Sequence, residues 1–151
     1  MVVMKRFLTL FFSTSFFFLS FSATASQQGT GLEIDNPELL QLVYTIDVDD
    51  VELAPLEAIV KEALTGTGIK LGQRKDAQLF LRIEEHADSY ILYLDFSRKM
   101  QYRVAETCYS KDGYVWGRYA KNIHDTEQLH EDVKFFFEEF IQKYQSANTM
   151  R

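Results

Sequence analysis

A single amphipathic segment near the C-terminus constrains this chain more than any other feature. Its apolar residues recur at helical spacing over about four turns, and its other side carries Glu138 and further polar residues. Asp125 or Thr126 can cap the start of this helix. A helix with one apolar side buries it against another element, so the segment predicts a long helix packed on a sheet. The apolar positions are Leu129, Val133, Phe136, Phe137, Phe140, Ile141 and Tyr144.

A second, shorter helix is predicted around Pro55, which the first turn of a helix accepts. Gly66 suits the left-handed position that follows the end of a helix. Between them, apolar residues recur at the spacing of one helical face. These residues are Leu56, Ile59, Val60, Ala63 and Leu64.

Strands are predicted on both sides of this shorter helix. Residues 39–48 are rich in residues that favour strands, and apolar and polar residues alternate in 78–85 and 90–98. Lys111-Asp112-Gly113 is interpreted as a tight hairpin turn with Gly113 in the left-handed conformation. The strands expected after the helix are 69–71, 78–85, 90–98, 102–110 and 114–122.

The order of these elements indicates the fold class. Short connections between the later strands favour an antiparallel meander. The sequence therefore predicts an α+β two-layer sandwich, with an antiparallel sheet of four to five strands and two helices packed on one face, in the order βα-ββββ-α. We expect one domain at residues 39–148 and, before it, a flexible N-terminal arm at 26–38.

The N-terminal segment predicts export. Lys5 and Arg6 precede an uncharged stretch, residues 7–21, and Ala23-Thr24-Ala25 then offers a site for signal peptidase. The alternative is a membrane anchor, but a spanning helix needs about 20 apolar residues. The stretch has only 15 residues, several of them Ser or Thr. We expect a signal peptide at 1–25, and a periplasmic or secreted mature protein without an integral membrane span.

Charge and composition narrow the function further. Without residues 1–25 the chain has 126 residues, with 14 basic and 22 acidic side chains, for a net charge of −8. This acidic balance argues against a protein that binds nucleic acid through phosphate contacts. The single cysteine, Cys108, excludes a disulfide framework within one chain and the lipid attachment of a bacterial lipoprotein.

No pattern in the sequence identifies a catalytic, cofactor-binding or metal-binding residue. A cysteine nucleophile needs a neighbouring base, and no local motif ties Cys108 to His86, His124 or His130. The acidic run Asp47, Asp49, Asp50 and Glu52 lacks the glycine and the distal glutamate of a calcium loop. Gly66 and Gly68 are not followed by the Lys-Ser/Thr pair of a phosphate loop.

A binding surface is the one functional feature that the strand pattern offers. If the apolar residues of the strands face the helices, then aromatic side chains and an arginine point away from them. Such residues are frequent anchors of protein interfaces, although ordinary cross-strand pairing explains them as well. The candidate surface consists of Phe80, Arg82, Tyr93, Tyr109 and Tyr119.

The C-terminal third carries a resemblance to a class of proteins. Its features are Cys108, Trp116-Gly117 and a final helix with Phe136 or Phe137, Phe140-Ile141, Tyr144 and Ala147-Asn148. Over residues 105–148 this resembles small exported bacterial proteins of uncharacterised function, in which a Trp-Gly strand pair precedes a final helix that ends in an aromatic-x-x-Tyr-x-x-Ala-Asn pattern. The order of elements also resembles periplasmic envelope-assembly domains, including the lipopolysaccharide-assembly lipoprotein type, from which this chain departs by lacking the lipid-attachment cysteine. Neither resemblance implies a catalytic residue.

Three hypotheses follow for the function. The first is a non-enzymatic exported protein that binds another protein or an envelope component, for example during envelope assembly. The second is a small secreted enzyme with a dispersed site, formed by Cys108 and a histidine or by a pair among Asp95, Glu106 and the acidic run. The third is a secreted inhibitor or effector. The sequence leaves the oligomeric state open.

Overall fold

The computed structural model describes residues 30–149, so the expected signal peptide at 1–25 lies outside the described residues. Five strands and two helices follow one another along the chain. They are β1 (Leu39–Asp47), α1 (Leu53–Leu64), β2 (Lys70–Leu71), β3 (Ala77–His86), β4 (Ser89–Val104), β5 (Thr107–Ile123) and α2 (Thr126–Thr149).

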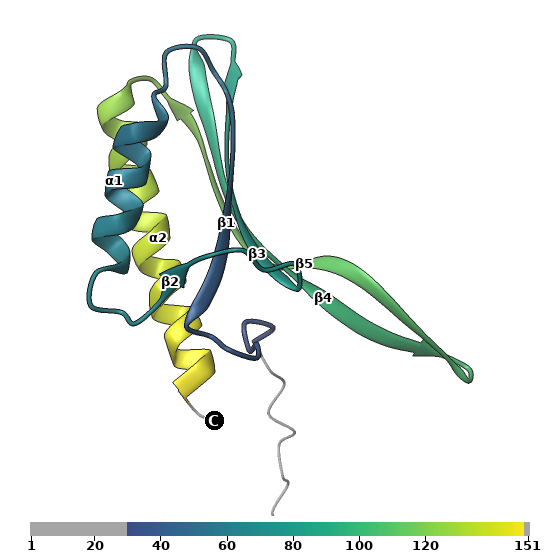
Figure 1. The fold of residues 1–151 in the computed structure, drawn as a ribbon. Coiled ribbons are helices and arrows are strands. Elements are labelled where there is room, and N and C mark those ends of the chain that lie inside the picture. Colours follow the sequence, from purple (N-terminus) through teal and green to yellow (C-terminus); the bar gives the residue numbers. More distant parts are fainter. Residues whose placement is uncertain (1–29, 150–151) are drawn as a thin grey trace, which may run out of the picture.

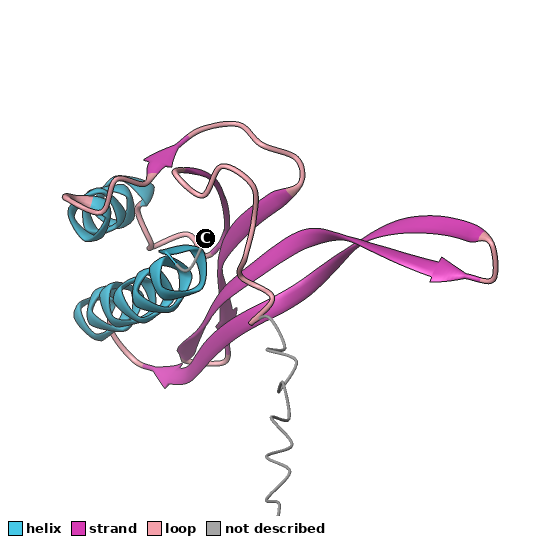
Figure 2. Ribbon diagram, turned by 90° about the horizontal axis from the view of Figure 1, so that it is seen from below, coloured by secondary structure: helices cyan, strands magenta, loops and turns pink. Residues whose placement is uncertain are grey.

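All five strands form one sheet in the order β2-β1-β3-β4-β5, and both helices lie on the same side of it (Figures 1 and 2). The predicted α+β class and its helix-covered sheet are confirmed. The predicted antiparallel meander describes β3, β4 and β5. The sheet as a whole is mixed, because β1 runs parallel to both of its neighbours, β2 and β3.

The core lies between the helices and the sheet. On β3, Leu79, Leu81 and Ile83 are fully buried and alternate with partly exposed residues, as expected of a strand with one covered side. All seven apolar positions predicted for the long helix are buried, which confirms the interpretation of that segment. Leu56, Val60 and Leu64 of α1 are buried as well.

Both predicted helix boundaries have a local cause. At the start of α2, the Asp125 carboxylate accepts a hydrogen bond of 2.8 Å from the backbone N–H of Gln128, as an N-cap residue does. After α1, Gly66 has φ = 77°, the left-handed conformation that glycine adopts without strain.

Aromatic side chains form the contact between α2 and the end of the covered sheet. The Phe140 ring lies between those of Phe96 on β4 and Trp116 on β5, with centroid distances of 5.5 and 5.2 Å. Tyr144 packs against Phe96 at 5.9 Å, and its hydroxyl donates a hydrogen bond to the Pro37 carbonyl. These tilted and edge-on rings pack in the arrangements that aromatic pairs prefer.

Residues 30–38, the described part of the flexible arm predicted at 26–38, pack against the domain, while 26–29 lie outside the described residues. Leu32 and Ile34 are 2% and 6% exposed and belong to the core. The side-chain amide of Asn148 donates to the Leu32 carbonyl, and its oxygen accepts from the Ile34 N–H. Two buried apolar side chains and this paired amide therefore hold residues 30–38 to the domain.

A buried arginine joins the same segment to the sheet. The Arg74 guanidinium donates to the carbonyls of Asp35, Asn36 and Leu39 and forms a bidentate pair with Asp76 at 2.7 and 2.9 Å. The pair lowers the pKa of the Asp76 carboxyl. All of these bonds come from one charged group, which strengthens them. Through them, Arg74 connects the start of β1 and the residues before it to the β2–β3 loop.

The predicted hairpin turn at Lys111-Asp112-Gly113 is wrong. The β4–β5 hairpin turns at Ala105 and Glu106 instead, between the paired residues Val104 and Thr107. Ala105 adopts the left-handed conformation that the turn needs, with φ = 54°. Lys111, Asp112 and Gly113 are extended parts of β5. The strand expected at 102–110 therefore contains the turn itself, with 102–104 ending β4 and 107–110 beginning β5, and the strand expected at 114–122 is a later part of β5.

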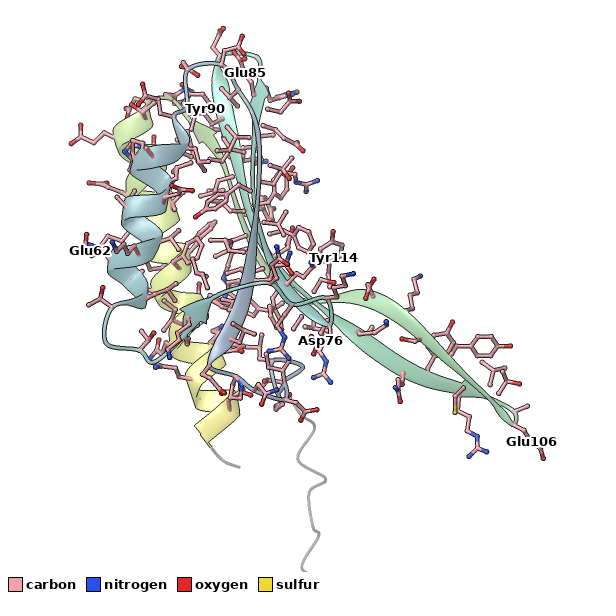
Figure 3. The ribbon with its side chains drawn as sticks, in the orientation of Figure 1. Glu62, Asp76, Glu85, Tyr90, Glu106 and Tyr114 are labelled. Carbon is pink, nitrogen blue, oxygen red and sulfur yellow. The ribbon has the colours of Figure 1, made fainter. Side chains whose placement is uncertain are left out.

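The ends of β4 and β5 project from the domain as a two-stranded ribbon. Figure 3 shows Glu106 at its far end. We name residues 98–113 the distal hairpin, since the pairs from Arg98–Gly113 to Val104–Thr107 all belong to it. The ribbon begins at a β-bulge, where Phe96 pairs with Trp116 and Ser97 with Tyr114, so that Val115 has no partner on β4.

We expect Phe140→Ala to lower the unfolding free energy by about 3–5 kcal/mol, because the fully buried ring fills the space between Phe96 and Trp116. Chemical denaturation measures this change. The matched control is Glu138→Ala, two positions away on the exposed side of α2. Equal small effects of the two substitutions would contradict this helix orientation.

An ion pair between α2 and β5 predicts a response to acid. Arg118 forms a bidentate bond with Glu139 and, with Lys143, lowers the pKa of that carboxyl to about 2. Its stabilising effect is complete above the usual pKa of 4.5 and is lost as the pH falls from there through about 2. Glu139→Gln should therefore reduce the fall in Tm across this range.

Melting curves at several pH values test this expectation. Glu138→Gln is the matched control, because Glu138 is exposed beside Glu139 on the same helix. A pH dependence that is the same in wild type and in Glu139→Gln would show that the ion pair does not stabilise the fold.

Candidate binding surface

The side of the sheet that faces away from the helices carries a group of aromatic side chains. Alternation along β3 and β4 places Phe80, Arg82 and Tyr93 on this side, since their neighbours in sequence are buried beneath the helices. Tyr114 and Tyr119 of β5 join them through ring contacts with Phe80 and Tyr93. We name these five residues the aromatic face.

Arg82, Tyr93 and Tyr119 form one continuous stack across three strands. The rings of Tyr93 and Tyr119 are stacked at a centroid distance of 6.4 Å, and the Arg82 guanidinium lies 4.2 Å from the Tyr93 centroid. The second contact is a cation–π interaction, in which the positive charge of Arg82 is attracted to the face of the Tyr93 ring. Arg82 and Tyr93 are therefore ordered before a partner binds. They present an aromatic and cationic surface that loses little conformational freedom on binding.

The other part of the aromatic face lies where the distal hairpin leaves the domain. Phe80 and Tyr114 meet edge to face at 6.1 Å. Tyr114 is 71% exposed, Tyr119 is 66% exposed, and Figure 3 shows Tyr114 directed away from the helices. Single exposed tyrosines are ordinary, but this group is contiguous across three strands.

A carboxylate lies within the aromatic face. Asp95 of β4 pairs with Phe80 on one side and with Gly117 on the other. A Cβ at position 117 would overlap the Asp95 carboxylate, so glycine leaves the space that this side chain occupies. Burial raises the pKa of Asp95, while Arg82 acts in the opposite direction. The surface thus combines aromatic rings with one cation and one partly buried acid.

The structure brings together four of the five side chains predicted for the binding surface: Phe80, Arg82, Tyr93 and Tyr119. Tyr109 lies on the distal hairpin, on the other side of the strand, where it stacks with Tyr102 at 5.5 Å. Tyr114 is a member that sequence reasoning missed. Both differences have one cause, because the bulge at Val115 inserts an extra residue and exchanges the two sides of β5.

The structure does not bring together the residues suggested for a dispersed enzyme site. Cys108 is exposed on the distal hairpin opposite Arg103. The length of β5, about 50 Å for a fully extended strand, separates it from His124. Glu106 lies at the tip of the hairpin, about 35 Å along β4 from Asp95.

The acidic run lies at the opposite end of the sheet from the hairpin tip. Asp47, Asp49, Asp50 and Glu52 are all exposed, and Asp50 accepts a hydrogen bond of 2.5 Å from the hydroxyl of the buried Tyr90. This bond raises the pKa of Tyr90. Among residues 30–149, no group of His, Cys, Asp and Glu side chains could hold a metal ion.

No helix within residues 30–149 is long and apolar enough to cross a membrane. No protein-family model matches the sequence, and no curated protein does. A crystal structure of a minor lipoprotein from Acinetobacter baumannii is similar over 73% of this chain and 92% of its own, with 16% sequence identity and a TM-score of 0.23. We infer no function from a likeness of this degree.

Proposed function

We propose that this chain is a non-enzymatic, exported accessory protein that binds another protein or an envelope component through the aromatic face. The observation that carries the proposal is the contiguous arrangement of Phe80, Arg82, Tyr93, Tyr114 and Tyr119 on the uncovered side of the sheet. Export rests on the signal sequence predicted at 1–25.

The chemistry of the aromatic face supports a protein partner. Tyrosine and arginine are the residue types that most often dominate the binding energy of protein interfaces. Tyr93 and Arg82 are held by their mutual contact, so a partner can pack on them without ordering them first. The acidic charge of the chain argues against nucleic acid as the partner.

Affinity capture from an envelope fraction tests the proposal. We expect the double variant Tyr93→Ser/Tyr119→Ser to reduce partner recovery by more than about tenfold, because removing a central aromatic anchor costs about 2 kcal/mol or more. Phe135→Ser is the control, since Phe135 is an aromatic residue of similar exposure on α2. Equal losses in both variants, or unchanged recovery in the double variant, would contradict this binding surface.

A second expectation concerns Cys108. A catalytic thiol needs a base or a positive environment that favours the thiolate, and Cys108 lies exposed near the hairpin tip, far from the histidines. Cys108→Ser should therefore support the same cellular function as the wild type in a deletion strain. Loss of function at a normal protein level on an immunoblot would favour a thiol enzyme or a disulfide-linked partner.

A further inference from the structure

The distal hairpin is amphipathic, although all of residues 99–112 are exposed. Opposed residues of an antiparallel pair point to the same side, so the pairs in this ribbon define its two sides. One side carries Met100, Tyr102, Val104 and Tyr109, with Lys111 opposite Met100 and Thr107 opposite Val104, and the two tyrosine rings are stacked. The other side is polar, with Lys99, Gln101, Arg103, Cys108, Ser110 and Asp112.

This ribbon also has an open edge. The pairing of β3 with β4 ends at Ala77–Arg98, and beyond it Lys99 donates one further hydrogen bond to the Asp76 carbonyl. Within residues 30–149, no strand lies beside the outer edge of residues 100–104. A two-stranded ribbon is only marginally stable in water, and an open strand edge readily pairs with another chain.

A second open edge lies on the opposite margin of the sheet. β2 covers β1 only at Leu39 and Leu40, so residues 42–47 of β1 are paired on one side alone. Beside this edge lies a groove of about 730 Å³. Leu42 and Tyr44 of β1, Leu64 at the end of α1 and Leu71 of β2 line it, and Glu57 and Lys61 form its polar wall. Burial raises the pKa of Tyr44 to about 12.

The geometry points to the distal hairpin of a second copy of this chain as the strand that occupies the β1 edge and its groove. Charge supports this occupant. Residues 98–113 contain four basic and two acidic side chains, whereas the other residues of 30–149 contain nine basic and twenty acidic. The hairpin is thus the one net positive projection of an otherwise strongly acidic described chain, and a second copy attracts it.

The backbone directions determine how the two edges fit. Gly72 N–H donates to the Leu40 carbonyl, so the even-numbered residues of β1 direct their backbone groups to the open edge. The Lys99 N–H donates to the Asp76 carbonyl, so the odd-numbered residues of β4 direct their backbone groups to the open edge of the distal hairpin. In a parallel pairing these backbone groups bond to each other while the apolar side chains of both strands lie on the helix-covered side of the sheet. An antiparallel pairing would direct the apolar side chains of the hairpin to the other side.

Within the open residues 42–47 of β1, one parallel register pairs all three apolar residues of the hairpin strand. It places Met100 opposite Leu42, Tyr102 opposite Tyr44 and Val104 opposite Ile46, and it places Arg103 opposite Thr45. The orientation is also the one in which β2 and β3 already lie against β1. Docking would cover the apolar side of the hairpin with the groove. It would also bring Glu106 beside the acidic run that follows β1, where like charges repel.

Sedimentation equilibrium of the mature chain, from micromolar to near-millimolar concentration, tests the proposal. We expect a mass that rises above one chain with concentration. Tyr102→Ser in the hairpin and Leu71→Asp in the groove should each weaken association more than tenfold; both residues are exposed, so the fold should survive. Glu106→Lys should strengthen association by removing the repulsion. Tyr119→Ser on the aromatic face is the control and should leave association unchanged, which separates this surface from the proposed partner site.

Cross-linking tests the register. In a Cys108→Ser background, chains carrying Thr45→Cys and chains carrying Arg103→Cys should form a mixed disulfide when combined under mild oxidation. Chains with Thr45→Cys and Lys99→Cys should not. A monomeric mass at every concentration, or self-association that persists in both Tyr102→Ser and Leu71→Asp, would overturn the proposal. Equal cross-linking of the two cysteine pairs would overturn the parallel register.

Discussion

The packing of Phe140 between Phe96 and Trp116 is the contact on which the rest of the structure depends. It fixes α2 across β4 and β5, and Phe96 is the last buried apolar residue of β4. Beyond Phe96, β4 continues to Val104 without a helix above it. The sheet therefore has one side that the helices cover and one uncovered side that carries the aromatic face. The distal hairpin extends beyond the helices.

The β-bulge at Val115 determines which residues these surfaces present. Because β5 has one more residue than β4 at this point, its side chains change sides between Trp116 and Tyr114. The aromatic face thereby gains Tyr114, and Tyr109 joins Tyr102 on the apolar side of the distal hairpin. Gly31 lies close by: its backbone passes Val115 so closely that a Cβ at position 31 would meet the Val115 side chain at 3.0 Å.

Much of this fold follows from one-dimensional patterns. Both helices were predictable because each has one apolar side, and the α2 cap and Gly66 mark boundaries that local chemistry decides. The alternating residues of β3 and β4 predicted the covered side, and hence four members of the aromatic face. These predictions succeed because each depends on residues close together in sequence.

The features that sequence reasoning missed depend on partners far away in the chain. Asp112-Gly113 is a strong local turn signal, yet pairing of these residues with Lys99 and Arg98 keeps them extended. The segment at 30–38 is ordered by Asn148, Tyr144 and Arg74, none of which is near it in sequence. The bulge at Val115 has no signal in the alternation of β5, so the side occupied by Tyr109 could not be read from it.

Hydrogen exchange of the dilute mature chain tests most directly the claim that the covered sheet ends at Phe96. Backbone amides of β4 before this residue lie beneath α2, whereas those of 100–104 either bond to β5 within the exposed ribbon or face its open edge. We expect slow exchange in peptides from 90–96 and 116–123, and exchange faster by orders of magnitude in peptides from 99–112. Equal protection along the whole of β4 and β5 would show that the covered sheet does not end at Phe96.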